Sequence, residues 1–173
     1  MDDLVRWLLE GDVSVQYLTH KYLLNSDPAI LEQLQNRIET KGYGAEYLFH
    51  QNPNGHWGIH YYQKKWTCTH YTLLDLKNLG ISPTLKPARE MVLRMFDECM
   101  LPDGGVDLSK SKLPCDICIN GMVLNYASYF CAEDPRLHKL AKFLLSVQKQ
   151  DGGFSWDTQS EKGDPHTTIC VLE

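Results

Sequence analysis

The sequence has no long apolar run and no excess of positive charge. No stretch of its 173 residues approaches the roughly 18 apolar residues that a membrane-spanning helix needs. The start, Met1-Asp2-Asp3, lacks the basic region of a secretion signal. The formal net charge is -5, so there is no overall basic field for a nucleic acid or an anionic membrane. We therefore expect a cytoplasmic protein that spans no membrane and binds no nucleic acid.

Several common patterns are also missing. The sequence contains no Gly-x-Gly-x-x-Gly, no Walker loop and no Gly-x-Ser-x-Gly, so nucleotide-binding and serine-hydrolase functions have no support. No segment alternates apolar and polar residues with the β-branched enrichment typical of strands. With 43% hydrophobic and 23% charged residues, the composition is that of a globular chain. These features predict an all-α fold.

The six cysteines are not arranged as a disulfide framework or a zinc ribbon. Cys115 and Cys118 form one Cys-x-x-Cys motif, and a second such motif, which a four-cysteine zinc ribbon needs, does not occur. The remaining four lie in apolar helical patterns, where a reduced thiol packs as a small hydrophobic group: Cys68, Cys99, Cys131 and Cys170.

A repeat organises the chain. Glycine-rich turns recur at Gly55, Gly104 and Gly152, at spacings of 49 and 48 residues. Apolar periodicity predicts a helix before each turn, over residues 29–51, 85–100 and 135–149, and another after it, over 67–79, 116–130 and from 165 onward. Each unit is therefore a helical hairpin with a long loop.

This repeat predicts one helical domain over residues 1–173. A leading helix pair occupies 1–27, followed by repeats at 28–82 and 83–133 and an incomplete repeat at 134–173. Residues 167–173 resemble a helix that has just begun, so we expect the chain to be a fragment of a longer protein. Periodicity alone does not separate a generic helical solenoid from a closed ring of hairpins.

The turns carry a more specific signature. Tyr47-x3-Gln51-x3-Gly55-x-Trp57 and Leu144-x3-Gln148-x3-Gly152-x-Phe154 resemble the Gln-Trp motif of terpenoid cyclases and protein prenyltransferase β subunits, which fold as an (α/α)6 toroid. The middle copy keeps the spacing but has Met100 and Val106 in place of the glutamine and the aromatic. In such a motif the glutamine bonds backbone groups at a helix end while the aromatic ring packs beneath the turn.

Further segments are similar to an uncharacterised bacterial prenyltransferase-like branch of this superfamily. These are His56-Trp57-Gly58, residues 65–72, Asn120-Gly121-Met122 and His166-Thr167-Thr168. The resemblance implies a partial toroid of hairpins.

A candidate metal site follows from the register of the repeat. Fourteen residues after the turn glycines lie Thr69, Cys118 and His166, which we expect at the starts of successive inner helices. Asp116 precedes Cys118 by two residues, and Asp, Cys and His together form a plausible zinc set with one open position. Prenyltransferase β subunits bind catalytic zinc through an Asp-x-Cys and a later His, which is what the resemblance implies here. Alternatively, Asp116 is only a helix cap and Cys118 a packed thiol.

Further side chains are candidates for binding an isoprenoid. Lys110 and Lys112 resemble the basic residues that hold the isoprenoid diphosphate, although a solvated loop explains them equally well. His70, Trp66 and Tyr126 are candidates to line an inner cavity. The alternative for each of these three is ordinary helix packing.

The expected function is therefore that of a prenyltransferase-like or terpenoid-cyclase-like toroid protein that binds an isoprenoid or lipid-like ligand, with zinc as cofactor. Cyclase chemistry is not expected, because the sequence has neither Asp-x-Asp-Asp nor Asp-Asp-x-x-Asp. Three questions stay open: whether it is a zinc-dependent transferase, whether it is a non-catalytic helical-repeat binding module, and whether catalytic groups follow Glu173. An uncovered apolar edge predicts a homodimer that completes the ring.

Overall fold

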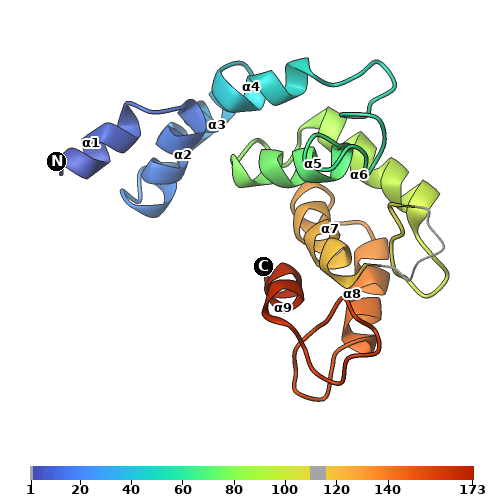
Figure 1. The fold of residues 1–173 in the computed structure, drawn as a ribbon. Coiled ribbons are helices and arrows are strands. Elements are labelled where there is room, and N and C mark those ends of the chain that lie inside the picture. Colours follow the sequence, from blue (N-terminus) through green and yellow to red (C-terminus); the bar gives the residue numbers. More distant parts are fainter. Residues whose placement is uncertain (1, 110–115) are drawn as a thin grey trace. The chain divides into compact units, whose positions relative to one another are not determined.

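The computed structural model describes residues 2–109 and 116–173, and its regular elements are all helices (Figure 1). These are α1 (Asp3–Leu9), α2 (Val13–Tyr22), α3 (Pro28–Ile38), α4 (Gly42–Phe49), α5 (Thr69–Asn78), α6 (Lys86–Cys99), α7 (Ile117–Phe130), α8 (Arg136–Ser146) and α9 (Pro165–Leu172). Strand-like pairing in the described residues is limited to one bridge between Met100 and Val106. The predicted all-α class is confirmed.

None of the helices in the part of the chain that the structure describes has the length and apolar character needed to cross a membrane. The chain divides into two compact units, Met1–Leu85 and Lys86–Glu173, which are treated separately below.

The first unit begins with helices capped by aspartate. Asp2, Asp12 and Asp27 each accept a backbone N–H in the first turn of the helix that follows, which satisfies a donor that the helix leaves unpaired. Helix α2 packs against α1 and α3. The side chains of Tyr17 and Ile38 are buried in this unit.

The helix predicted over residues 29–51 is wrong, because the structure divides it into α3 and α4. The chain turns after Ile38, and Gly42 adopts a left-handed φ of 68° that interrupts regular helix geometry. The carboxylate of Asp12 stabilises both helix starts: one oxygen accepts Ser14 N at 2.8 Å and the other accepts Tyr43 N at 3.0 Å. A capping group thirty residues away in sequence therefore defines where α4 begins.

The second unit is built from α6, α7, α8 and α9. Helix α7 contacts α6 and α8, and its most extensive contact is with α9, which lies beside it (Figure 1). At the α7–α9 contact, Gly121 leaves so little space that an added Cβ would lie 2.3 Å from the carbonyl oxygen of Cys170. The core of the unit consists of buried side chains from all four helices, including Met95, Phe96, Val123, Phe130, Leu140, Leu144 and Cys170.

The three glycine turns share one backbone geometry. In each turn the first residue donates its N–H to the carbonyl four residues later, at 2.9, 2.7 and 2.9 Å, and accepts from the glycine N–H at 2.8, 3.0 and 2.9 Å. The first residues are Asn52, Leu101 and Lys149, and the glycines have φ values of 86°, 95° and 83°. Left-handed backbone of this kind favours glycine, which explains its recurrence.

The glutamines of the turn motif bond the turn glycines, whereas the prediction was a bond to backbone groups at the end of the preceding helix. Gln51 Nε2 donates to the carbonyl of Gly55 at 2.9 Å, and Gln148 Nε2 donates to that of Gly152 at 2.7 Å. The ring of Trp57 is buried, and its Nε1 donates to the carbonyl of Tyr47. The motif therefore stabilises the turn and the end of the preceding helix.

A polar side chain in the helix that follows anchors each turn. Trp57 N donates to Thr69 Oγ1 at 3.1 Å, and the corresponding pairs are Val106 N to Asn120 Oδ1 at 2.7 Å and Phe154 N to Thr168 Oγ1 at 3.0 Å. Thr69 thus anchors its turn as Asn120 and Thr168 do, but it is the first residue of α5, whereas they are the fourth residues of α7 and α9. As predicted, Thr69, Cys118 and His166 all lie in the first turns of their helices, although the anchor of the turn comes later in α7 and α9 than in α5.

Candidate functional site

Asp116 and Cys118 lie together at the start of α7. Asp116 is the N-cap residue, and its Oδ1 accepts the backbone N–H of Cys118 at 3.2 Å and the thiol of Cys118 at 3.0 Å. Burial, together with the hydrogen bond to Asp116 and the negative charge of that carboxylate, raises the pKa of the Cys118 thiol to about 12. The metal-free thiol therefore keeps its proton at neutral pH.

Helix α9 packs against α7 and carries two further candidate groups. Cys170 is buried on α9, and burial raises the pKa of its thiol. His166 is exposed in the first turn of α9, two residues after the N-cap residue Asp164. Cys118 likewise follows its N-cap residue by two, so the two side chains hold corresponding positions on α7 and α9.

The structure joins only part of the predicted metal set. Asp116 and Cys118 are in contact, but across residues 2–109 and 116–173 no three His, Cys, Asp or Glu side chains form a group that could hold a metal ion. His166 is thus not placed with the other two. The predicted phosphate-binding residues Lys110 and Lys112 lie outside the described residues.

Two of the predicted cavity residues are buried in the helical core. His70 is fully buried in α5, where its ring forms T-shaped contacts with the rings of Tyr62 and Tyr71, and burial lowers its pKa to about 3. Tyr126 is fully buried in α7 and donates its hydroxyl to the sulfur of Met95 at 3.3 Å. Both placements match the packing interpretation that the sequence left open.

Trp66 differs from these two residues, because it is 70% exposed. Its backbone is left-handed, with a φ of 77°, and its ring lies 4.9 Å from that of Tyr71. Trp66 lines a pocket of about 480 Å³ in the first unit, together with Tyr47 and Trp57 and the polar residues Asn52, Thr67 and Thr72. The sequence had identified Trp66 but not the partners with which it forms this pocket.

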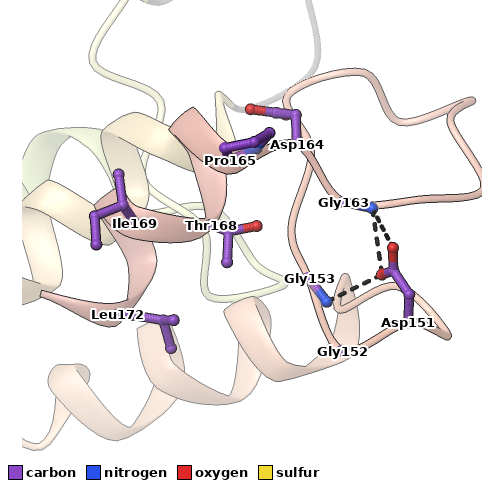
Figure 2. Close-up of a pocket in the computed structure, with 9 residues that line it drawn as sticks. All are labelled: Asp151, Gly152, Gly153, Gly163, Asp164, Pro165, Thr168, Ile169 and Leu172. Carbon is purple, nitrogen blue, oxygen red and sulfur yellow. Dashed lines mark hydrogen bonds between the residues drawn. The ribbon is translucent and has the colours of Figure 1, made fainter.

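A second open pocket of about 480 Å³ lies beside α9 (Figure 2). The carboxylate of Asp151 accepts the backbone N–H groups of Gly153 and Gly163, each at 3.0 Å, and these bonds lower its pKa. The carboxylate oxygens of Asp151 are therefore engaged in holding the loop between Gly153 and Gly163. Ile169 and Leu172 line the same pocket and are 54% and 70% exposed, so this side of α9 presents apolar surface.

Comparisons with family models, curated proteins and solved structures find no match to this chain. The resemblance to the toroid superfamily rests on the motifs quoted above and stays a prediction.

Proposed function

We propose that this chain is a helical-repeat protein of the α/α-toroid type that binds zinc through Asp116 and Cys118 and accepts an isoprenoid or lipid-like ligand. The observation that carries the zinc proposal is the 3.0 Å contact between Cys118 Sγ and Asp116 Oδ1 at a helix start. Carboxylate and thiolate are both established zinc ligands. Lys110 and Lys112 are the residues proposed to hold the diphosphate of an isoprenoid.

The distance between the two groups supports shared coordination. Zinc bonds of about 2.3 Å to sulfur and about 2.0 Å to oxygen at a tetrahedral angle place the two ligand atoms about 3.5 Å apart. The thiol and the carboxylate need to separate by only about 0.5 Å from their present 3.0 Å. Zinc would replace the thiol proton. His166 is the proposed third ligand, on a side chain exposed in the first turn of α9.

Zinc analysis of the full chain tests this proposal. We expect equimolar zinc after purification with zinc and dialysis, and loss of the metal in Cys118→Ser. Cys131→Ser is the matched control, because Cys131 is buried in the same unit and a serine there retains an acceptor in the carbonyl of Arg89. Absence of zinc from the wild type, or equal zinc in the two variants, would contradict the proposal.

Asp116→Asn separates metal binding from capping. Asparagine is as good an N-cap as aspartate, whereas alanine at such a position lowers the free energy of unfolding by about 1 kcal/mol. We therefore expect Asp116→Asn to unfold like the wild type and yet to lose zinc. Unchanged zinc in this variant would show that the carboxylate is no ligand.

A second candidate function is a non-catalytic helical-repeat binding module. It is favoured by the capping bonds of Asp116, because Asp2, Asp12 and Asp27 cap their helices in the same way with no thiol involved. In this case Asp116 and Cys118 would serve only the folding of α7. The zinc measurements above distinguish the two candidates.

We also propose that the protein forms a homodimer through α9. The exposed Ile169 and Leu172 provide the apolar surface for this contact. Ile169→Glu should abolish the dimer in light scattering over a concentration series. Leu145→Glu is the control, because Leu145 is similarly exposed on α8 of the same unit. A wild type that is monomeric throughout the series would contradict the dimer.

A further inference from the structure

The pocket beside Trp66 lies within the first unit and involves none of the proposed zinc ligands. Its residues come from the end of α4, the turn at Gly55, the loop that follows and the first half of α5. Its volume of about 480 Å³ falls within the range of about 300 to 1,000 Å³ typical of small-molecule sites.

Three aromatic side chains contribute to the lining: Tyr47, Trp57 and Trp66. Trp66 is 70% exposed, and its backbone is left-handed, a strained conformation of the kind that clusters at ligand clamps and other functional sites. The Nζ of Lys65 lies 5.8 Å from the centroid of the Trp66 ring. This indole is therefore accessible to a cation at cation–π distance.

The charges around the pocket are negative on the side of α4 and α5. Asp75 Oδ2 accepts the hydroxyl of Tyr47 at 2.7 Å, and Glu46 Oε1 lies 3.1 Å from Nε2 of His50, which also lines the pocket. Burial and the bond to Asp75 raise the pKa of Tyr47 to about 12, so its phenol keeps its proton. The described lining contains no Lys or Arg side chain. An anionic ligand is disfavoured on the side of α4 and α5, whereas the ammonium of Lys65 lies near the ring of Trp66.

We propose that this pocket binds a quaternary ammonium group. The rings of Tyr47 and Trp66 supply cation–π contacts, and the carboxylates of Asp75 and Glu46 supply a favourable field. A methylated ammonium fits an aromatic lining better than a metal ion does, because it is weakly hydrated and has an apolar outer surface. The proposal does not depend on zinc binding.

Titration calorimetry of the full chain with choline tests the site. The comparison ligand is 3,3-dimethylbutan-1-ol, in which a carbon replaces the charged nitrogen while the shape stays the same. We expect choline to bind about tenfold more tightly than the neutral alcohol, since a cation–π contact contributes on the order of 1 to 2 kcal/mol. No binding of choline, or equal binding of the two ligands, would overturn the proposal.

Single substitutions then locate the site. Trp66→Ala should weaken choline binding about tenfold, whereas Trp66→Phe should retain part of the affinity. Trp7→Ala is the matched control, because Trp7 is similarly exposed on α1 of the same unit. Lys65→Gln should strengthen binding about twofold to fivefold, because it removes a cation that competes for the Trp66 ring. Equal effects of Trp66→Ala and Trp7→Ala would place the binding elsewhere.

The ammonium group has two natural sources, a free small molecule and a lipid headgroup. Sedimentation with phosphatidylcholine vesicles, with phosphatidylglycerol vesicles as control, distinguishes them. Binding to phosphatidylcholine that free choline competes away supports a headgroup ligand, and choline binding without vesicle binding supports a free ligand. Vesicle binding that Trp66→Ala leaves unchanged would contradict a headgroup role for this pocket.

Discussion

Gly121→Ala is expected to lower the free energy of unfolding of residues 86–173 by about 3 kcal/mol. The new Cβ would lie 2.3 Å from the carbonyl oxygen of Cys170 and 2.7 Å from Cα of Val171. These atoms belong to the backbone of α9, so no side-chain rotation relieves the clash and the two helices must separate. In a helix without such a contact, alanine would be more stable than glycine by about 1 kcal/mol. A large loss of stability in Gly121→Ala would therefore be due to the contact between α7 and α9.

The effect is measured by chemical denaturation, with hydrogen exchange to assign the loss to the second unit. Gly152→Ala is the control in the same unit. Gly152 has a φ of 83° but no atom within 4 Å of an added Cβ, so its substitution should cost only about 1 kcal/mol of backbone strain. If Gly121→Ala were the milder of the two variants, the close approach of α7 and α9 would be refuted.

Trp57→Ala is expected to lower the free energy of unfolding of residues 1–85 by about 3 to 5 kcal/mol. The side chain is only 2% exposed, and its Nε1 donates to the carbonyl of Tyr47 at 2.6 Å. The substitution leaves a cavity beneath the Gly55 turn and removes the donor of that buried bond. Trp57→Phe keeps most of the buried ring, so its cost should be nearer 1 to 2 kcal/mol, about the worth of the bond and a smaller void.

Segment-resolved hydrogen exchange checks this prediction, because the loss should appear in α4, α5 and the intervening loop. Trp7→Ala provides the surface reference, with a change expected within about 0.5 kcal/mol, since Trp7 is 67% exposed. A similar loss in both tryptophan variants would mean that Trp57 does not hold the turn in place.

The features that the sequence predicted best depend on residues a few positions apart. The glutamine and glycine of a turn are four residues apart, and the side chain of Gln51 bonds the backbone close by, at the carbonyl of Gly55. Asp116 and Cys118 are two residues apart at a helix start, where a capping carboxylate must lie near the second helical residue. Such contacts form wherever the local backbone is helical, so the pattern of residues suffices to predict them.

Other features escaped prediction because their partners are distant in the chain. The break between α3 and α4 involves Asp12, which bonds Tyr43 across 31 residues. The anchor of the first turn became visible only through the bond from Trp57 to Thr69, which spans 12 residues where the corresponding bonds of the other two turns span 14. The polar residues Asp12 and Thr69 were visible in the sequence in each case, but their partners were not evident.

The sequence was sufficient for the helical class, for the three recurring turns and for the pairing of Asp116 with Cys118. Short-range hydrogen bonds and apolar periodicity account for all of these. The packing of the chain determined that His70 and Tyr126 are buried and that Trp66 is exposed over a pocket. It also determined that His166 is not grouped with Asp116 and Cys118. Burial and side-chain grouping depend on which helices meet, and that is a property of the folded chain rather than of local spacing.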